Sequence, residues 1–284
     1  MNIKSIKLIS VISMCTVFSG LSAGAQTTVS EVSTTQSQIK PDNISAEKIF
    51  SLSTSIEYSQ KVEVEQNVER ERGTDINLVA GYKINSLYSV NAKTGFTKEL
   101  SGPQNTTMAN TTLGAAVKGI QINPETITTH GLSVVLPTSE VSQKRDRLNT
   151  SISLANGVSY KGEIISAKYT LGLTKNFHEF EQNAEGAFLT EYRITNGLDL
   201  SAALTEKFSI SVSGLYRTSF TYTKDQKYSF AIDSDLNYDL TEKLATNLGV
   251  SNEGSALKDN GADTNINIYD GKSSVFRAGI TYTY

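Results

Sequence analysis

Charged residues recur at every second position in several segments of the chain, where they alternate with apolar residues. Asp233 and Asp235 are one example. Arg217 is another, because the residues at every second position on either side of it are mainly Ser and Thr. Side chains at alternate positions of a strand point to the same side. If these charges face the hydrated interior of a barrel, they can pair with one another and stiffen the barrel wall. Alternatively, they can present a charged surface to solutes that pass through. The residues to which these alternatives apply are Glu57, Lys93, Arg193, Arg217, Asp233, Asp235 and Arg277.

Counting from the turns between the expected strands predicts which of these charges meet. Arg277, in the last strand, should face Glu57 in the first strand and pair with it across the seam of a closed sheet. Arg217 should lie near Asp233 on the following strand. We favour mutual pairing as the role of the charges, and the alternative is a basic constriction that selects anionic solutes. That constriction would consist of Lys93, Arg193, Arg217 and Arg277.

Catalytic chemistry finds little support in the sequence. A phospholipase would need a Ser/His pair with an orienting partner, and a membrane protease would need an Asp/His arrangement. The chain has 2 histidines. His130 alternates in step with apolar residues such as Leu132, and His178 lies in an expected loop, 176–180. Neither stands in a catalytic motif that we recognise, so we predict no enzymatic activity, no cofactor and no metal site.

The segment 259–270 carries oxygen-bearing side chains at alternating positions, which is a feature of calcium-binding loops. It departs from the EF-hand pattern, because Thr264 stands where that loop needs glycine and Asp270 replaces the usual glutamate. We therefore interpret the segment as a polar loop and not as an ion site.

The start of the chain has the three parts of a secretory signal peptide. Lys4 and Lys7 precede the apolar run 8–18, and Ala23-Gly24-Ala25 provides a cleavage site of small residues. The apolar run is too short to span a membrane. We predict a signal peptide over residues 1–25, removed after Ala25.

Export has consequences for cysteine and charge. Cys15 is the only cysteine, so the mature chain has none for a disulfide or a thiolate metal site. Lipid attachment to Cys15 is disfavoured because Met14, which precedes it, is not a small residue. Cleavage also removes two lysines and takes the net charge from −3 to −5, which argues against nucleic acid as a partner.

Two further regions follow the predicted signal peptide. Residues 26–48 are rich in Ser, Thr and Gln and have little to bury, so we predict a flexible periplasmic leader. From residue 49 to residue 284 the hydrophobic period is two, which indicates one all-β domain. We expect twelve strands, at approximately 49–60, 73–83, 86–97, 107–120, 126–137, 147–161, 163–176, 187–204, 207–222, 226–240, 243–252 and 273–284.

The connections between these strands alternate between short and long. Two of the short ones repeat the phrase Leu-Thr-Glu-Lys, at 204–207 and 240–243. Alternating lengths and an even number of strands are typical of an antiparallel barrel with tight turns at one end and longer loops at the other. A soluble β-sandwich is disfavoured, because the expected strands are longer than those of soluble sheets and one parity is polar throughout.

The last strand narrows the class of barrel. Phe276, Ile280, Tyr282 and Tyr284 alternate with other residues, and the final residue is aromatic. This pattern resembles the assembly signal of Gram-negative outer-membrane β-barrel proteins, and the phrase 131–139 is also similar to a strand-to-loop phrase of such barrels. The resemblance implies a transmembrane antiparallel barrel in the cell outer membrane, surrounded by lipid. It also implies delivery by periplasmic chaperones and the barrel-insertion machinery. It does not fix an oligomeric state.

The size of the barrel bears on its function. Twelve strands about 4.8 Å apart and tilted by about 40° close a cylinder of roughly 12 Å backbone radius. Inward side chains of about 5 to 6 Å leave a narrow path or none. We therefore predict a porin-like, narrow diffusion channel for small polar solutes, anionic ones included. The alternative is a non-conducting structural or surface-binding barrel that acts through its external loops.

Overall fold

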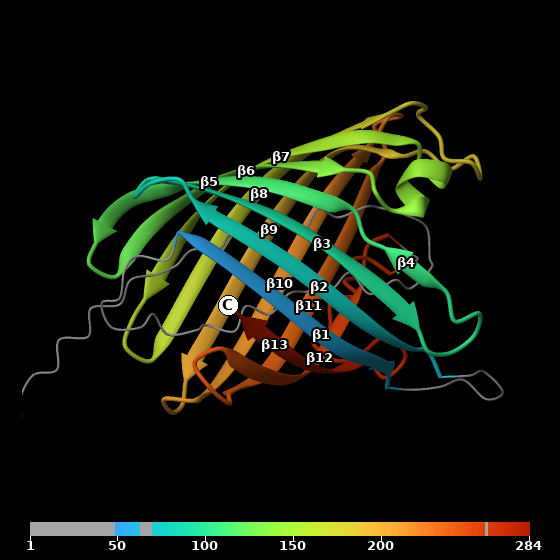
Figure 1. Cartoon of the computed structure of the whole chain (residues 1–284). Helices are drawn as coiled ribbons and strands as arrows, with labels where there is room; N and C mark the ends of the chain where they lie inside the picture. The colour runs from blue at the N-terminus through green and yellow to red at the C-terminus, as the bar shows by residue number, and fades with distance from the viewer. Residues whose placement is uncertain (1–48, 63–69, 259–260) are drawn as a thin grey trace, which may run out of the picture.

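The protein folds into one closed antiparallel β-barrel (Figure 1). Its wall has twelve staves, where a stave is one strand or, in one case, two short strands in line. The structure is a computed structural model, and it describes residues 49–62, 70–258 and 261–284. The predicted signal peptide, 1–25, and the predicted leader, 26–48, lie outside the described residues. No helix in the described part of the chain is long and apolar enough to cross a membrane.

The twelve strands predicted from the alternation of residue types are confirmed. One of them, predicted over 107–120, is interrupted at residues 109 and 110, so that two strands, β4 and β5, form a single stave. Both pair with β3, through Phe96 with Met108 and Lys93 with Thr112. The strands are β1 (Phe50–Lys61), β2 (Arg72–Lys83), β3 (Tyr88–Glu99), β4 (Thr106–Met108), β5 (Thr111–Asn123), β6 (Thr126–Leu136), β7 (Leu148–Lys161), β8 (Ile165–His178), β9 (Thr190–Ala203), β10 (Phe208–Thr221), β11 (Gln226–Asp239), β12 (Leu244–Ser255) and β13 (Val275–Thr283).

The barrel closes where the last strand meets the first. β13 pairs with β1 in antiparallel register, with Ile280 opposite Ile56 and Arg277 opposite Ser59. Every other stave pairs with its neighbours in the sequence. Among the described residues the closed order pairs every strand on both sides except the short β4, which pairs with β3. The backbone donors and acceptors of the wall are therefore largely satisfied within the sheet, as a lipid environment requires.

The two faces of the wall differ as the alternation predicts. Ile56, which points outward on β1, is 52% exposed, whereas Asp75, which points inward on β2, is 3% exposed. Most of the buried residues are polar or charged, whereas most of the large apolar side chains that point outward along the staves are exposed or half-buried. This is an inside-out pattern, in which lipid solvates the apolar outer face.

Aromatic residues face outward near both ends of the staves. Tyr238 and Tyr282 lie near the short-turn end, while Tyr216 and Tyr228 stack near the loop end with ring centroids 6.4 Å apart. Tyr and Phe in such positions form the girdles that mark the two membrane interfaces of a barrel.

The repeated phrase Leu-Thr-Glu-Lys has a structural cause. The hydroxyl oxygen of Thr205 accepts hydrogen bonds from the backbone N–H groups of Lys207 and Phe208, at 3.2 and 3.0 Å. Thr241 accepts the same two bonds, from Lys243 and Leu244, at 3.2 and 3.0 Å. The threonine therefore satisfies the donors of a tight turn between neighbouring staves.

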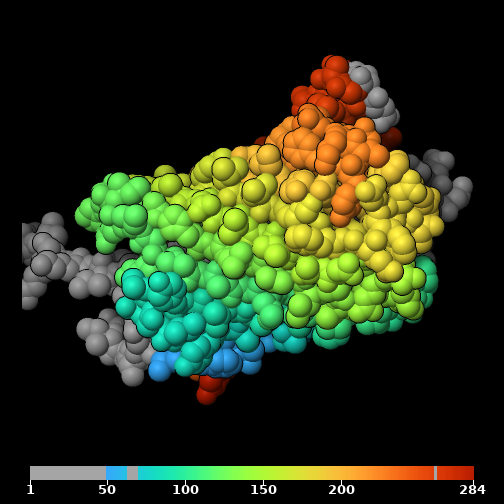
Figure 2. Space-filling view, turned by 90° about the horizontal axis from the view of Figure 1, so that it is seen from above, coloured from blue at the N-terminus to red at the C-terminus, as the bar shows by residue number. Residues whose placement is uncertain are grey.

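The longer connections lie at the opposite end of the barrel. The β6–β7 connection contains a short π-helix, η1 (Val141–Arg145). The connection between β12 and β13 differs in its direction. It is red in Figure 2 and projects sideways from the outer wall, next to the orange strands.

Candidate functional site

The most connected charge in the lumen is Arg277 on β13. Its Nη2 atom lies 2.9 Å from Oδ1 of Asp233, and it donates to both carboxylate oxygens of Asp235 at 3.1 Å. Both acids are on β11, two staves away, and all three side chains are buried. Arg277 thus bridges β11 and β13 across the intervening stave β12.

The predicted seam pair between Arg277 and Glu57 is present as a longer contact. Nη1 of Arg277 lies 3.8 Å from Oε1 of Glu57. The other carboxylate oxygen, Oε2, accepts a hydrogen bond from Nδ2 of Asn247 at 3.4 Å. The network therefore extends from β11 to β1 and holds together the staves on both sides of the closure.

Asp75 adds a further carboxylate beside this network. It is the cross-strand partner of Glu57, and its Oδ1 atom accepts a hydrogen bond from Oγ1 of Thr97 at 2.5 Å. The alternation places Asp75 on the inward face, but only the strand register sets it directly opposite Glu57. We call the four carboxylates with Arg277 the acidic arc; its residues are Glu57, Asp75, Asp233, Asp235 and Arg277.

Glycines make the long reach of these side chains possible. A Cβ atom at Gly249, on β12, would lie 1.9 Å from Oδ1 of Asp235. A Cβ atom at Gly279, on β13, would lie 2.5 Å from Oδ1 of Asn247. The polar side chains lie flat over these glycines and cross to the next stave. The role of these two glycines could not be predicted from the sequence, because it depends on the register of the strands.

Arg193 and Arg217 lie on neighbouring staves of another part of the wall. Arg193, on β9, is the cross-strand partner of Ser219 on β10, and its Nε atom donates to Oγ of Ser219 at 3.3 Å. Arg217 is two residues from Ser219 and faces the same side. Both arginines are buried. We call Arg193 and Arg217 the arginine pair.

The prediction that Arg217 lies beside Asp233 is corrected by the register. The cross-strand partner of Arg217 on β11 is Ser229, and that of Asp233 on β10 is Ser213. Asp233 instead makes its ion pair with Arg277. The turn after β10 sets Arg217 opposite Ser229, so Arg217 and Asp233 lie at different levels along two neighbouring strands.

The remaining predicted lumen residue is Lys93. It lies on β3, where its cross-strand partners are Val79 and Thr112. The structure thus brings Arg193 next to Arg217, joins Arg277 with the acids, and leaves Lys93 on a different stave from both groups.

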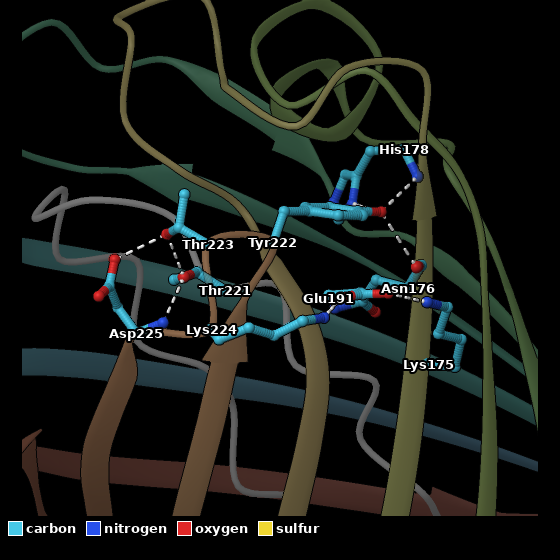
Figure 3. A network of polar contacts seen from close by, with 9 residues as sticks. All are labelled: Lys175, Asn176, His178, Glu191, Thr221, Tyr222, Thr223, Lys224 and Asp225. Carbon is cyan, nitrogen blue, oxygen red and sulfur yellow. Dashed lines mark hydrogen bonds and ion pairs between the residues drawn. The ribbon is translucent and has the colours of Figure 1, made fainter.

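A second polar cluster lies at the loop end of β8, β9 and β10 (Figure 3). The Oε1 atom of Glu191 lies 2.5 Å from Nζ of Lys175, and its Oε2 atom lies 2.6 Å from Nζ of Lys224. The Lys175 ammonium also lies 3.9 Å from the ring centroid of Tyr192. This cluster could not be predicted from the sequence, because Glu191 occupies a register irregularity between β9 and β10 that the alternation does not reveal.

The two histidines occupy separate places. Nδ1 of His130 lies 2.8 Å from Oδ1 of Asn156 on the outward face of β6 and β7. Nδ1 of His178 lies 3.3 Å from the hydroxyl of Tyr222 at the loop end (Figure 3). The rings thus lie at separate positions, on staves that are not neighbours.

The barrel is similar to outer-membrane channels of known structure. An outer membrane channel from Pseudomonas putida F1 superposes with a TM-score of 0.56 at 10% sequence identity, over 86% of this chain and 99% of that chain. The NanC porin superposes with a TM-score of 0.55 at 8% identity, over 81% of this chain and 98% of that chain. No protein-family model matches the sequence, and no curated protein matches it. The closed sheet, its apolar outer face and these likenesses show that the chain has the fold of an outer-membrane β-barrel channel.

Proposed function

We propose that the protein is a narrow diffusion channel for small polar solutes, anionic ones included. The observation that carries the proposal is the polar lining of the barrel. The inward residues of the staves are mainly Ser, Thr, Asn, Gly and charged residues, and a lining of this composition favours a hydrated lumen. The proposal includes no catalytic step.

The distribution of charge along the wall supports selective passage. The acidic arc lies on β11, β13, β1 and β2, whereas the arginine pair lies on β9 and β10. In the order of the twelve staves, β9 lies six staves from β2, on the opposite wall. The two groups adjoin where β10 pairs with β11, and they are opposed only at their far ends, β9 and β2. A solute in the lumen therefore meets both carboxylates and guanidinium groups, which favours polar solutes over apolar ones.

The two groups of charges have different roles in this proposal. Arg277 is engaged with three carboxylates, so its charge is largely offset by the acids around it. The arginine pair carries two like charges on neighbouring staves. We assign the preference for anions to Arg193 and Arg217, and we assign to Arg277 the role of holding the seam together.

Lys168 does not extend the arginine pair into a longer basic track. Its cross-strand partner on β9 is Asp199, so the two opposite charges meet on the same part of the wall. On β9 and β10, the preference for anions is therefore assigned to Arg193 and Arg217 alone.

Solute uptake into vesicles tests the proposal. Protein refolded without the signal peptide is inserted into liposomes, and swelling is followed in solutions of neutral and anionic sugars of increasing size. We expect swelling with small solutes and none with large ones. The Arg193→Gln/Arg217→Gln variant should slow entry of the anionic sugars more than that of the neutral ones.

Lys175→Gln is the matched control, because it removes a positive charge from the outward face of β8. It should leave the rates unchanged. A correctly folded protein that gives no swelling with any solute would contradict the proposal and favour a non-conducting barrel that acts through its external loops.

A further inference from the structure

The connection between β12 and β13 covers part of the outer wall. We call residues 261–274 of this connection the β12–β13 flap. Asn252, on β12, shares the outward face with Leu248 and Val250, yet it is 2% exposed. Phe230, on the outward face of β11, is also buried, whereas Leu236 on the same face is exposed. The buried positions mark the footprint of the flap on a face that otherwise meets lipid.

Hydrogen bonds hold the flap in this place. Nδ2 of Asn252 donates to the carbonyl of Asn267 at 2.8 Å, and Oδ1 of Asn252 accepts from Oγ of Ser273 at 2.7 Å. The backbone N–H of Asn265 donates to the carbonyl of Ala256 at 2.9 Å. One buried amide thus ties both halves of the flap to the wall, which explains a polar residue at an outward position.

The flap lies at the level of the outer membrane interface. Phe230 is close to the loop end of β11, two residues from Tyr228, which belongs to the aromatic girdle at that end. Girdle residues mark the boundary between acyl chains and headgroups. Figure 2 shows the flap, in red, standing out from the wall beside β11 and β12 instead of closing over the mouth.

The flap carries apolar side chains that no stave covers. Ile268 is 67% exposed, and Ile266 and Tyr269 are also exposed. The neighbouring staves β12 and β13 also present exposed apolar side chains on their outer face, Leu248 and Phe276 among them. We propose that the flap inserts Ile266, Ile268 and Tyr269 into the outer leaflet at the boundary of headgroups and acyl chains, as an anchor of the barrel to lipid. This inference is independent of conduction through the lumen.

Tryptophan fluorescence gives a direct test, because the chain contains no tryptophan. Ile268→Trp places a single reporter in the flap. Phe96→Trp, on the outward face of β3, is the reference for contact with lipid, and Pro103→Trp, in the exposed turn after β3, is the reference for contact with water. Each variant is refolded into vesicles whose acyl chains are either brominated or not.

We expect emission of the Ile268→Trp variant at short wavelength, and quenching by brominated lipid comparable to that of Phe96→Trp. Adding Asn252→Ala should release the flap and reduce quenching of the Ile268→Trp reporter, while quenching in the Phe96→Trp background stays unchanged. If Ile268→Trp does not fold, Tyr269→Trp provides the reporter with a smaller change.

Two results would overturn the inference. Quenching no greater than in the Pro103→Trp variant would show that the flap faces water. Short-wavelength emission without quenching would show that the reporter is buried against protein, as in contact with a second copy of the chain, and not in lipid.

Discussion

Arg277 on β13 and Asp235 on β11 meet across an entire stave, with Nη2 3.1 Å from both carboxylate oxygens. The backbone between them belongs to β12, where Gly249 leaves the space that the Asp235 side chain occupies. Contacts of this kind join three staves at once, so they stiffen the region next to the closure of the barrel.

Gly249→Ala should disrupt the Arg277–Asp235 contact. The new Cβ atom would lie 1.9 Å from Oδ1 of Asp235, so the carboxylate must move away. We expect a loss of roughly 1–3 kcal/mol in the free energy of unfolding, as for other overpacked buried sites. Urea titration of the folded barrel in lipid measures it.

Gly172→Ala is the control for that change, since Gly172 also faces inward. Its nearest neighbour would lie at 3.5 Å from the new Cβ atom, an ordinary contact distance. The control should unfold at the same urea concentration as the unmodified protein. Equal unfolding midpoints for the Gly249 and Gly172 variants would show that the space over Gly249 is not required.

Arg277→Gln should destabilise the barrel more than Glu57→Gln. The first change leaves several buried carboxylates without their shared cation, which costs about 3 kcal/mol or more when a buried pair is broken. The second removes only the partner at 3.8 Å. Urea unfolding of both variants gives the comparison.

The same experiment has an internal check. Asp235→Asn combined with Arg277→Gln should cost less than the sum of the two single changes, because the acid no longer lacks its partner. Strict additivity of the two changes would mean that the contact between Arg277 and Asp235 contributes nothing to stability.

The positions of the strands could be predicted from the sequence, and so could the inward or outward direction of most of their side chains. In β10 and β11 the alternation of apolar and polar residues identifies both the strand and its inward side, because the period of a strand is two. It also predicted the contact between Arg277 and Glu57. The interruption at residues 109 and 110 was not predictable in this way, because such irregularities depend on pairing with a neighbouring stave.

The principal partners of Arg277 were missed for a related reason. Asp233 and Asp235 were recognised as inward-facing, but their contact with Arg277 depends on the register of three staves and on Gly249 between them. Alternation assigns a face and leaves the position along the barrel open. The loop-end cluster around Glu191 escaped prediction because the register shifts there.

Glu191→Gln should loosen the turn between β10 and β11. It removes the carboxylate that binds Lys175 and Lys224 (Figure 3), and ion pairs at the protein surface contribute about 1 kcal/mol or less. We therefore expect a local effect, seen as faster hydrogen exchange at the backbone N–H groups of Thr221 and Lys224 with little change in global stability.

Glu140→Gln is the matched control, because it also removes a carboxylate that binds a lysine, Lys144, at the loop end. Exchange at residues 221 and 224 should not change in this variant. Faster exchange there in both variants would indicate a general effect of charge at the loop end and would contradict the specific contact.

The reversal potential of single channels in a planar bilayer tests the central claim most directly. In a salt gradient, the protein should give discrete conductance steps with a reversal potential that indicates preference for anions. The Arg193→Gln/Arg217→Gln variant should shift that potential toward cations, and Lys175→Gln should not. A folded barrel that gives no conductance steps would contradict the account, as would steps whose reversal potential is the same with and without the arginine pair.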